Sequence, residues 1–267
     1  MIINPYAFGV SYDPDAQAFF TASGLTGATN LTAINNLVVA LKGFGIWTKM
    51  KAIYPMVGGT AALHKWNLKD PRDLDAAFRL VFAGGWTHSS TGALPNGTNG
   101  YADTFLNANT ILQQFSHHHA FYHNTDNIGT ALRSMGGAQS TSTVNFRTTI
   151  ESSGAVLNFR DLGTANAETG LTASTLKGFR ASSRTANNNM FIVKADGTST
   201  SPSLAITSNT LPSLNCLIAA HGASTTPQNY AAMSVAFHSI GDGLTAAEGL
   251  DLRNIVQAYN TTLSRQV

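Results

Sequence analysis

The chain has 267 residues, of which 43% are hydrophobic and only 11% are charged, and its formal net charge is +2. The Lys and Arg residues are scattered, which excludes a basic stripe for nucleic acid, and no apolar run reaches the roughly 20 residues that span a bilayer. Cys216 is the only cysteine, so an intrachain disulfide is excluded, and its apolar neighbours predict a buried side chain.

Two helices are predicted at the start of the chain. Asp13 can cap a helix that has Pro14 at its first position and ends before Gly24. A second helix is predicted from residues 26–28 to Lys42, and its apolar stripe must pack on the β region that follows. The residues of this stripe are Leu31, Ile34, Leu37, Val38 and Leu41.

Short strands are predicted over most of the remaining chain. The first two strands are predicted at residues 46–56 and at the mostly apolar residues 77–82, and the second strand is expected to be buried. Clusters of Gly, Asn, Ser and Thr then separate further β segments up to Ser239, and Asp196-Gly197 suits a tight hairpin turn. These further strands are expected at residues 101–106, 117–123, 144–149, 155–159, 178–183, 190–194, 211–219 and 230–239.

The last segment again predicts a helix. Thr245 and Glu248 have the spacing of a capping box, in which each side chain accepts a hydrogen bond from the backbone amide of the other. An apolar stripe follows, formed by Leu252, Ile255, Val256, Tyr259 and Leu263. The expected fold class is therefore mainly β, with helices at the two ends of the chain.

Residues 232–245, with the sequence AMSVAFHSIGDGLT, resemble a pattern of concanavalin A-like (laminin G-like) jelly rolls in phage and bacterial surface proteins. In that pattern a last core strand ends in a glycine turn, and a helix follows. Three further segments are similar to middle strands of such modules: residues 178–184, the hairpin at Asp196-Gly197 and residues 211–221. The resemblance covers the chain from Leu63 to the C-terminus and implies an antiparallel jelly-roll sandwich.

The best candidate for a boundary within the chain is near Gly58-Gly59, which could equally be an internal loop. Residues 1–57 are expected to form a helical segment that packs on the body or extends from it, and residues 58–267 the jelly roll with its C-terminal helix. Low charge and strands rich in Asn, Thr and Gly favour a phage origin. Residues 1–10 carry no basic residue and do not match a secretion signal.

The acidic residues do not match the hydrolases of this fold. Those enzymes carry Glu-x-Asp-x-x-Glu on one strand, which supplies a nucleophile and a general acid. None of Glu151, Glu168 and Glu248 has an Asp two positions later. Asp73 and Asp75 are the one close acidic pair in the strand region, and a solvated turn is their expected place. We therefore expect no catalytic residue and no enzymatic activity.

A histidine-rich strand is the first candidate for a binding surface. His117, His119 and His123 share one face of the predicted strand with Phe121. Imidazoles two residues apart can ligate zinc or nickel, but a metal site also needs further ligands and supporting hydrogen bonds. We expect an exposed polar strand face without a metal or cofactor. In this aromatic and histidine-rich strand, His117, His119 and Tyr122 are candidates for stacking on a sugar ring or a neighbouring subunit.

A stretch between two strands is the second candidate. Trp86 and His88 precede it and Tyr101 follows it, and aromatic rings beside hydrogen-bonding side chains suit carbohydrate. The alternative left open is that Trp86 and Tyr101 only anchor a flexible loop to the body. A calcium site is a weaker alternative, because the spacing of the nearby oxygen ligands is not that of an EF-hand. These ligands are Asp103, Asn107 and Asn109.

The expected function is that of a phage virion structural protein, a tail, fibre or decoration component whose lectin-like jelly roll binds a host-surface glycan as receptor. Its expected partners are other virion proteins and copies of itself, in a homo-oligomer such as a trimer. The expected location is the phage particle, after synthesis in the host cytoplasm without a signal peptide, with no membrane insertion. One alternative is a purely structural subunit-contact protein without glycan binding. Another is a polysaccharide-degrading enzyme.

Overall fold

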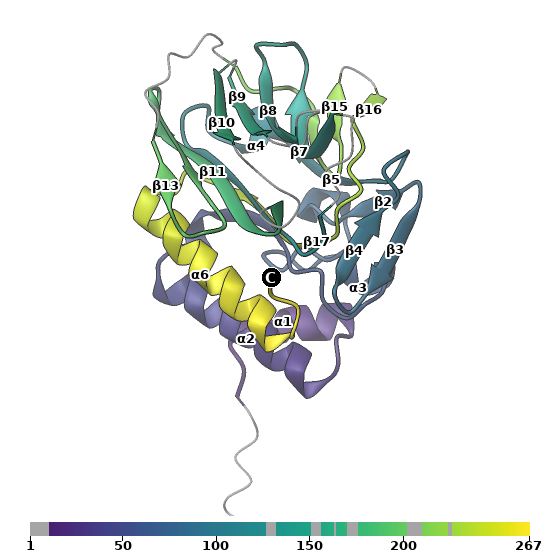
Figure 1. The fold of residues 1–267 in the computed structure, drawn as a ribbon. Coiled ribbons are helices and arrows are strands. Elements are labelled where there is room, and N and C mark those ends of the chain that lie inside the picture. The colour runs from purple at the N-terminus through teal and green to yellow at the C-terminus, as the bar shows by residue number, and fades with distance from the viewer. Residues whose placement is uncertain are drawn as a thin grey trace, which may run out of the picture.

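The structure is a computed structural model that describes residues 11–126, 132–150, 156–162, 164–169, 176–201, 210–223 and 226–267. Two β-sheets lie face to face, and three helices cover the outer face of one of them (Figure 1). The predicted fold class, a mainly antiparallel β-sandwich with helices at both ends, is confirmed. No helix within these ranges is both long and apolar enough to cross a membrane.

The helix-covered sheet has eight strands among the described residues. In spatial order they are β13 (Ser199–Thr200), β12 (Asn189–Val193), β11 (Gly178–Ala186), β6 (His117–His123), β17 (Val235–Gly241), β4 (Gly92–Pro95) and β3 (Trp86–Ser89), and β1 (Met50–Tyr54) pairs with β17. All these pairs are antiparallel. Because β6 and β17 lie in the middle, both of their faces are covered, and every residue in them is buried.

The opposite sheet has nine strands in the described part of the chain. In spatial order they are β10 (Thr164–Thr169), β9 (Val156–Asp161), β8 (Asn145–Ile150), β7 (Arg133–Gln139), β14 (Asn215–Ile218), β5 (Tyr101–Asn107) and β2 (Val81–Ala83). Two short strands extend it, β15 (His221–Ala223), which pairs in parallel with β7, and β16 (Thr226–Gln228), which pairs with β15. The described helices α1 (Pro14–Ser23), α2 (Ala28–Gly43) and α6 (Ala246–Thr262) all lie on the side of the other sheet (Figure 1).

One hydrophobic core lies between the two sheets. Phe121 of β6 and Phe159 of β9 stack within it at a centroid distance of 6.4 Å. Cys216 belongs to the same core and is fully buried, as predicted. Burial in apolar surroundings raises the pKa of the Cys216 thiol well above its usual value, so this cysteine is a packing residue and not a nucleophile.

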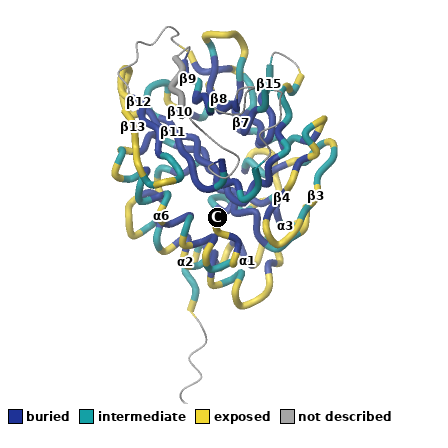
Figure 2. The backbone as a smooth tube through the Cα atoms, in the orientation of Figure 1, coloured by how far each residue is buried: buried dark blue, intermediate teal, exposed yellow. Residues whose placement is uncertain are grey.

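A second core lies between the helix-covered sheet and the helices. Helix α6 (Ala246–Thr262) packs on β11, α2 (Ala28–Gly43) packs on α6, and α1 (Pro14–Ser23) packs on α2. Figure 2 shows the result: the sheet strands are buried, and exposed backbone gathers on the outer sides of the helices and at the loops. The apolar stripes that predicted α2 and α6 therefore face this core.

The helix ends confirm the signals in the sequence. The Asp13 side chain accepts a hydrogen bond from the Asp15 amide at 2.9 Å, and Gly24 ends α1 in the left-handed conformation with φ of 70°. At the start of α6, Thr245 and Glu248 form both hydrogen bonds of the capping box. Glu248 also pairs with Lys49 at 2.6 Å, which ties this helix to the residue before β1.

Three predictions about strands were wrong in part. Residues 77–82 were expected to form a buried strand, but only Val81–Ala83 pair, as a short edge strand, because Phe78 has a positive φ of 59° that breaks the extended run. The strand predicted at 46–56 shortens to Met50–Tyr54 because a 3₁₀ turn occupies Trp47–Lys49. The stretch after Trp86 was expected to be flexible, but β3 and β4 form a hairpin there.

The segment expected to pack on the body, residues 1–57, contains α1, α2 and β1 among its described residues. Strand β1 pairs with β17 inside the sheet, with Ile53 opposite Ser239. The two helices share their core with residues of the later chain, such as Phe237 and Tyr259. The boundary between residues 57 and 58 stays a prediction.

Candidate functional site

The histidine-rich strand β6 does not form an exposed surface. His117, His119 and His123 do share one face with Phe121, as predicted, but each has about 1% of its surface exposed because this face lies against the opposite sheet. The expectation of an exposed polar strand face was therefore wrong. Tyr122, on the other face, is also buried, and its hydroxyl accepts a hydrogen bond from the Val267 amide at 2.8 Å.

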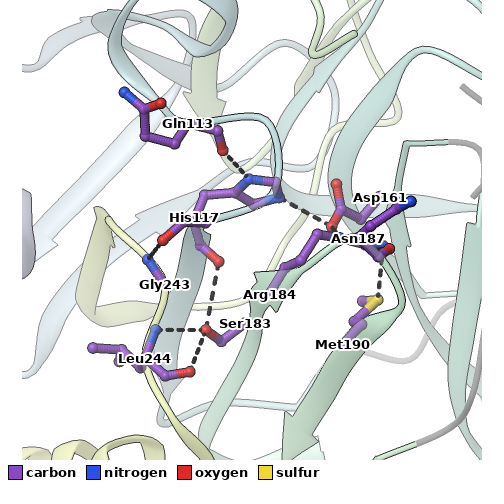
Figure 3. Close-up of polar contacts among 10 residues, drawn as sticks. Gln113, His117, Asp161, Ser183, Arg184, Asn187, Met190, Gly243 and Leu244 are labelled. Carbon is purple, nitrogen blue, oxygen red and sulfur yellow. Dashed lines mark hydrogen bonds and ion pairs between the residues drawn. The ribbon is translucent and has the colours of Figure 1, made fainter. Parts of the chain in front are cut away.

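His117 belongs to a buried charged cluster (Figure 3). Its Nδ1 lies 2.8 Å from the Gln113 carbonyl oxygen, and its Nε2 lies 3.0 Å from Asp161 Oδ2. Arg184, which is fully buried, donates from Nε to the same carboxylate oxygen at 2.6 Å. Burial is the largest single effect on the pKa of Asp161, and by itself it would raise this pKa. The charges and hydrogen bonds of His117 and Arg184 together outweigh it, so the pKa lies below its usual value. The cluster thus neutralises a carboxylate inside the sandwich, and it is structural.

His119 of β6 lies beside His238 of the neighbouring strand β17, with 2.9 Å between their Nε2 atoms. Burial lowers the pKa of His119 to about 3 and that of His238 well below its usual value, so both rings are neutral at pH 7. His123 places Nδ1 at 3.1 Å from the Ser234 carbonyl oxygen, and burial lowers its pKa to about 4. None of these three rings reaches a surface where a sugar binds. No group of three or more His, Cys, Asp or Glu residues gathers as a metal site in the described ranges.

Trp86 anchors the β3–β4 hairpin to the neighbouring sheet. Its ring Nε1 donates to the carbonyl oxygens of Ala83 and Tyr101, both at 3.1 Å. The ring also packs edge-on against Phe82 at a centroid distance of 5.1 Å. These bonds support the anchoring role for Trp86, and they bring it to the backbone of Tyr101 rather than to the side chain.

His88, on the same hairpin, pairs with the buried His64 at 3.0 Å between the two Nδ1 atoms. His64 Nε2 accepts from the Gly59 amide at 3.2 Å, so neutral His64 carries its proton on Nδ1 and donates it to His88. Burial lowers the pKa of His64 to about 3 and also lowers the pKa of His88. His88 therefore presents a neutral ring that joins the hairpin to α3 (Ala61–His64).

Tyr101 lies at a different place, in an open cleft of about 360 Å³ on the outer face of the nine-stranded sheet. Strand β5 alternates, with Ala102 and Thr104 buried and the side chains of Tyr101 and Asp103 facing the cleft. Strand β14 forms the floor beside β5, and β16 forms a wall. The polar residues that line the cleft are Tyr101, Asp103, Asn107, Ser213, Asn215 and Thr226.

The Asp103 carboxylate is held in a defined orientation. Its Oδ1 accepts from the Phe105 amide at 2.7 Å and from Asn215 Nδ2 at 3.1 Å, and its Oδ2 lies 3.3 Å from the same Asn215 nitrogen. A carboxylate has about four acceptor sites. Since this long contact is the only one that Oδ2 receives from the described part of the chain, Oδ2 can accept hydrogen bonds from hydroxyl groups of a ligand.

An aromatic wall lies beside this carboxylate. The rings of Tyr101 and Tyr230 are 6.4 Å apart at an interplanar angle of 44°, and Tyr230 donates its hydroxyl proton to the Pro227 carbonyl oxygen at 3.0 Å. Pro227 itself lines the cleft. Partly exposed rings next to oriented polar groups are the arrangement that packs on the apolar face of a sugar while its hydroxyls are hydrogen-bonded.

Of the predicted binding residues, the structure places Tyr101 alone in this cleft. Asp103 and Asn107, considered in the sequence as calcium ligands, also line it, and the period-two pattern Tyr-x-Asp-x-x-x-Asn could have shown that they share a face with Tyr101. Asn109 lies beyond the strand, where its amide donates to Asn107 at 3.2 Å. Sequence reasoning missed Asn215, because it comes from a strand more than a hundred residues away.

No protein-family model and no curated protein matches this sequence. Solved structures with a similar fold include a Trypanosoma rangeli sialidase in complex with 2,3-difluoro-KDN, with a TM-score of 0.54 and 8% identity over 87% of this chain and 40% of that one. A T. rangeli sialidase mutant with trans-sialidase activity has a TM-score of 0.54 and 10% identity over 87% and 39%. The binding domain of botulinum neurotoxin serotype D has a TM-score of 0.55 and 7% identity over 82% and 52%.

These structures share the β-sandwich fold with this chain, which spans about half of their length or less. The likeness extends to sialidases and to a toxin binding domain, and these three structures give no link to a phage. The expectation that the chain is not an enzyme is corrected here, because sialidases are among its structural neighbours. At this identity the likeness shows the fold alone, so it assigns no reaction to the chain.

Proposed function

We propose that this chain is a glycan-binding β-sandwich module that holds a sugar in the cleft over β5 and β14. Within this proposal it serves as a structural component of a phage virion, in the tail, a fibre or a decoration layer, and binds a glycan of the host surface. Copies of the chain form a homo-oligomer, since several weak sites acting together give stable attachment.

The observation that carries the proposal is the pairing of Tyr101 with Asp103 in one open cleft. The Tyr101 ring offers an apolar surface, and Asp103 Oδ2 offers acceptor sites two residues along the same strand. A volume of about 360 Å³ lies within the roughly 300–1,000 Å³ of typical small-molecule sites. Asn107, Ser213 and Asn215 supply further polar groups around it.

The similar folds support the proposal at the level of architecture. One sialidase structure holds 2,3-difluoro-KDN, a sugar-acid derivative, and another neighbour is described as a binding domain. The virion role rests on the low charge and the Asn-, Thr- and Gly-rich strands of the sequence. It is tested by immunogold labelling of purified phage particles with an antibody against this chain, and particles free of the protein would contradict it.

The glycan-binding role is tested on an array of neutral and acidic oligosaccharides and bacterial polysaccharides, with the protein presented as a multimer. We expect binding by the wild-type chain and about a tenfold loss of affinity, or about 1.4 kcal/mol, for Tyr101→Ala. Phe44→Ala is the matched control, because Phe44 is an aromatic residue that is 54% exposed and does not line the cleft, and this variant should bind normally. A folded wild-type chain that binds no glycan would contradict the proposal.

A further inference from the structure

The described residues that line the cleft carry negative charge and no positive charge. Of the lining residues that the structure describes, Asp103 alone carries a charge, and it is negative. The neighbouring polar groups, from Asn107, Ser213, Asn215 and Thr226, are neutral amides and hydroxyls. A ligand in this cleft therefore meets a carboxylate and no lining cation.

Two arginines near the site do not change this balance. Arg133 donates to the Tyr230 carbonyl oxygen at 3.2 Å and is not part of the lining. Arg147 lies three strands away from Asp103 in the same sheet, with Leu217 and Gly137 between them in the register. Three strand spacings put its Cα about 14 Å from the Cα of Asp103. Neither arginine is among the residues that line the cleft.

We infer that the cleft selects neutral sugars and rejects sialylated and other anionic glycans, an inference that rests on the proposed function. The hydroxyls of a neutral sugar donate to Asp103 Oδ2, and charge-assisted hydrogen bonds of this kind are the stronger ones. The carboxylate of a sialic acid in the same place repels Asp103 and finds no lining cation.

Asp103 is therefore the residue that determines specificity. Two carboxylates a few ångströms apart in a partly exposed cleft repel enough to weaken binding by about tenfold or more. Asp103→Asn keeps the size of the side chain and an oxygen that accepts from the Phe105 amide, but it removes the charge. This substitution separates the effect of charge from that of shape.

The test uses lactose and N-acetyllactosamine, each with and without a terminal sialic acid, beside the neutral and acidic bacterial polysaccharides of the array. We expect the wild-type chain to bind neutral members at least about tenfold more tightly than acidic ones. Asp103→Asn should weaken neutral binding and reduce this ratio to about threefold or less. Asp75→Asn, which removes an exposed carboxylate outside the cleft, should leave the ratio unchanged.

The outcomes separate the two claims. Preference of the wild-type chain for sialylated or other acidic glycans, with binding still lost in Tyr101→Ala, overturns the inference and leaves glycan binding in place. An unchanged ratio in Asp103→Asn also overturns it. No binding to any glycan by the folded chain overturns the proposed function itself.

Discussion

The Nε2 atoms of His119 and His238 lie 2.9 Å apart in the fully buried centre of the sandwich. One neutral ring donates its proton to the other, so protonation of the accepting ring at Nε2 places two donors face to face, whereas protonation of the donating ring leaves this bond but puts a charge in the buried centre. His238 Nδ1 has no hydrogen-bond partner among the described residues, so a charge on this ring would also be poorly solvated. The pair is therefore stable only while both histidines are neutral.

The first prediction is that acid destabilises the fold. The folded pKa of His119 is about 3, below the unfolded value of about 6.5, so the unfolded chain binds protons first as the pH falls. Each such histidine lowers the free energy of unfolding by about 1.4 kcal/mol per pH unit below pH 6.5, down to its folded pKa. Other histidines of this kind are His238, whose pKa lies well below its usual value, His64 and His221, with pKa values of about 3, and His118 and His123, with values of about 4.

Urea unfolding between pH 7.5 and 4.5 measures this effect. Stability should decline steeply below pH 6.5, and the decline should be shallower in the double variant His119→Gln/His238→Gln, which lacks two of the titrating groups. Equal free energies of unfolding at pH 7 and pH 5 would contradict the neutral buried histidines.

The buried ion pair gives the second prediction. Arg184→Met leaves the Asp161 carboxylate, whose side chain is 6% exposed, without the guanidinium 2.6 Å away. Removing one partner of such a pair costs about 3–5 kcal/mol of unfolding free energy. Arg72→Met breaks an ion pair in which the arginine side chain is 62% exposed, and it should cost less than about 1 kcal/mol. Similar losses in the two variants would show that the buried cluster does not stabilise the sandwich.

A pair of glycines gives the third prediction. Gly137 of β7 has a φ of 115°, and a Cβ there would lie 2.1 Å from the Phe146 carbonyl oxygen. Gly24 has a φ of 70° but open space around it. Gly24→Ala should cost about 1–2 kcal/mol through backbone strain alone, and Gly137→Ala clearly more because two strands must separate. Thermal unfolding of both variants compares them, and a Gly137→Ala protein as stable as Gly24→Ala would refute the close strand contact.

The role of Trp86 gives the fourth prediction. Trp86→Phe keeps an aromatic ring against Phe82 but removes the Nε1 donor to Ala83 and Tyr101. We expect a loss of about 1–3 kcal/mol in stability, from two carbonyl oxygens left with fewer partners, and no more than about a twofold change in glycan affinity. A folded variant that binds glycan about tenfold more weakly would instead place Trp86 in the binding surface.

Local signals in the sequence predicted local structure well. Asp13 with Pro14, and Thr245 with Glu248, begin helices because the capping hydrogen bonds span only a few residues. The Asp196-Gly197 hairpin is equally local, with Gly197 at a φ of 86°. Such contacts depend on neighbours in the sequence, so the sequence alone is sufficient to predict them.

Whether a strand is exposed depends on segments that are distant in the sequence. The pattern at 117–123 correctly predicted which side chains share a face, but both faces of β6 are covered by segments from elsewhere in the chain, the helices and the opposite sheet. For the same reason the cleft could be predicted only in part. Tyr101 and Asp103 follow from the alternation of one strand, whereas Asn215 arrives through the pairing of β14 with β5.

A crystal structure of the chain with its best array ligand would locate the bound sugar. We predict a sugar ring against Tyr101, with hydroxyl groups within hydrogen-bond distance of Asp103 Oδ2. A sugar bound instead on the β3–β4 hairpin or between α2 and α6, with the cleft over β5 and β14 left open, would contradict it.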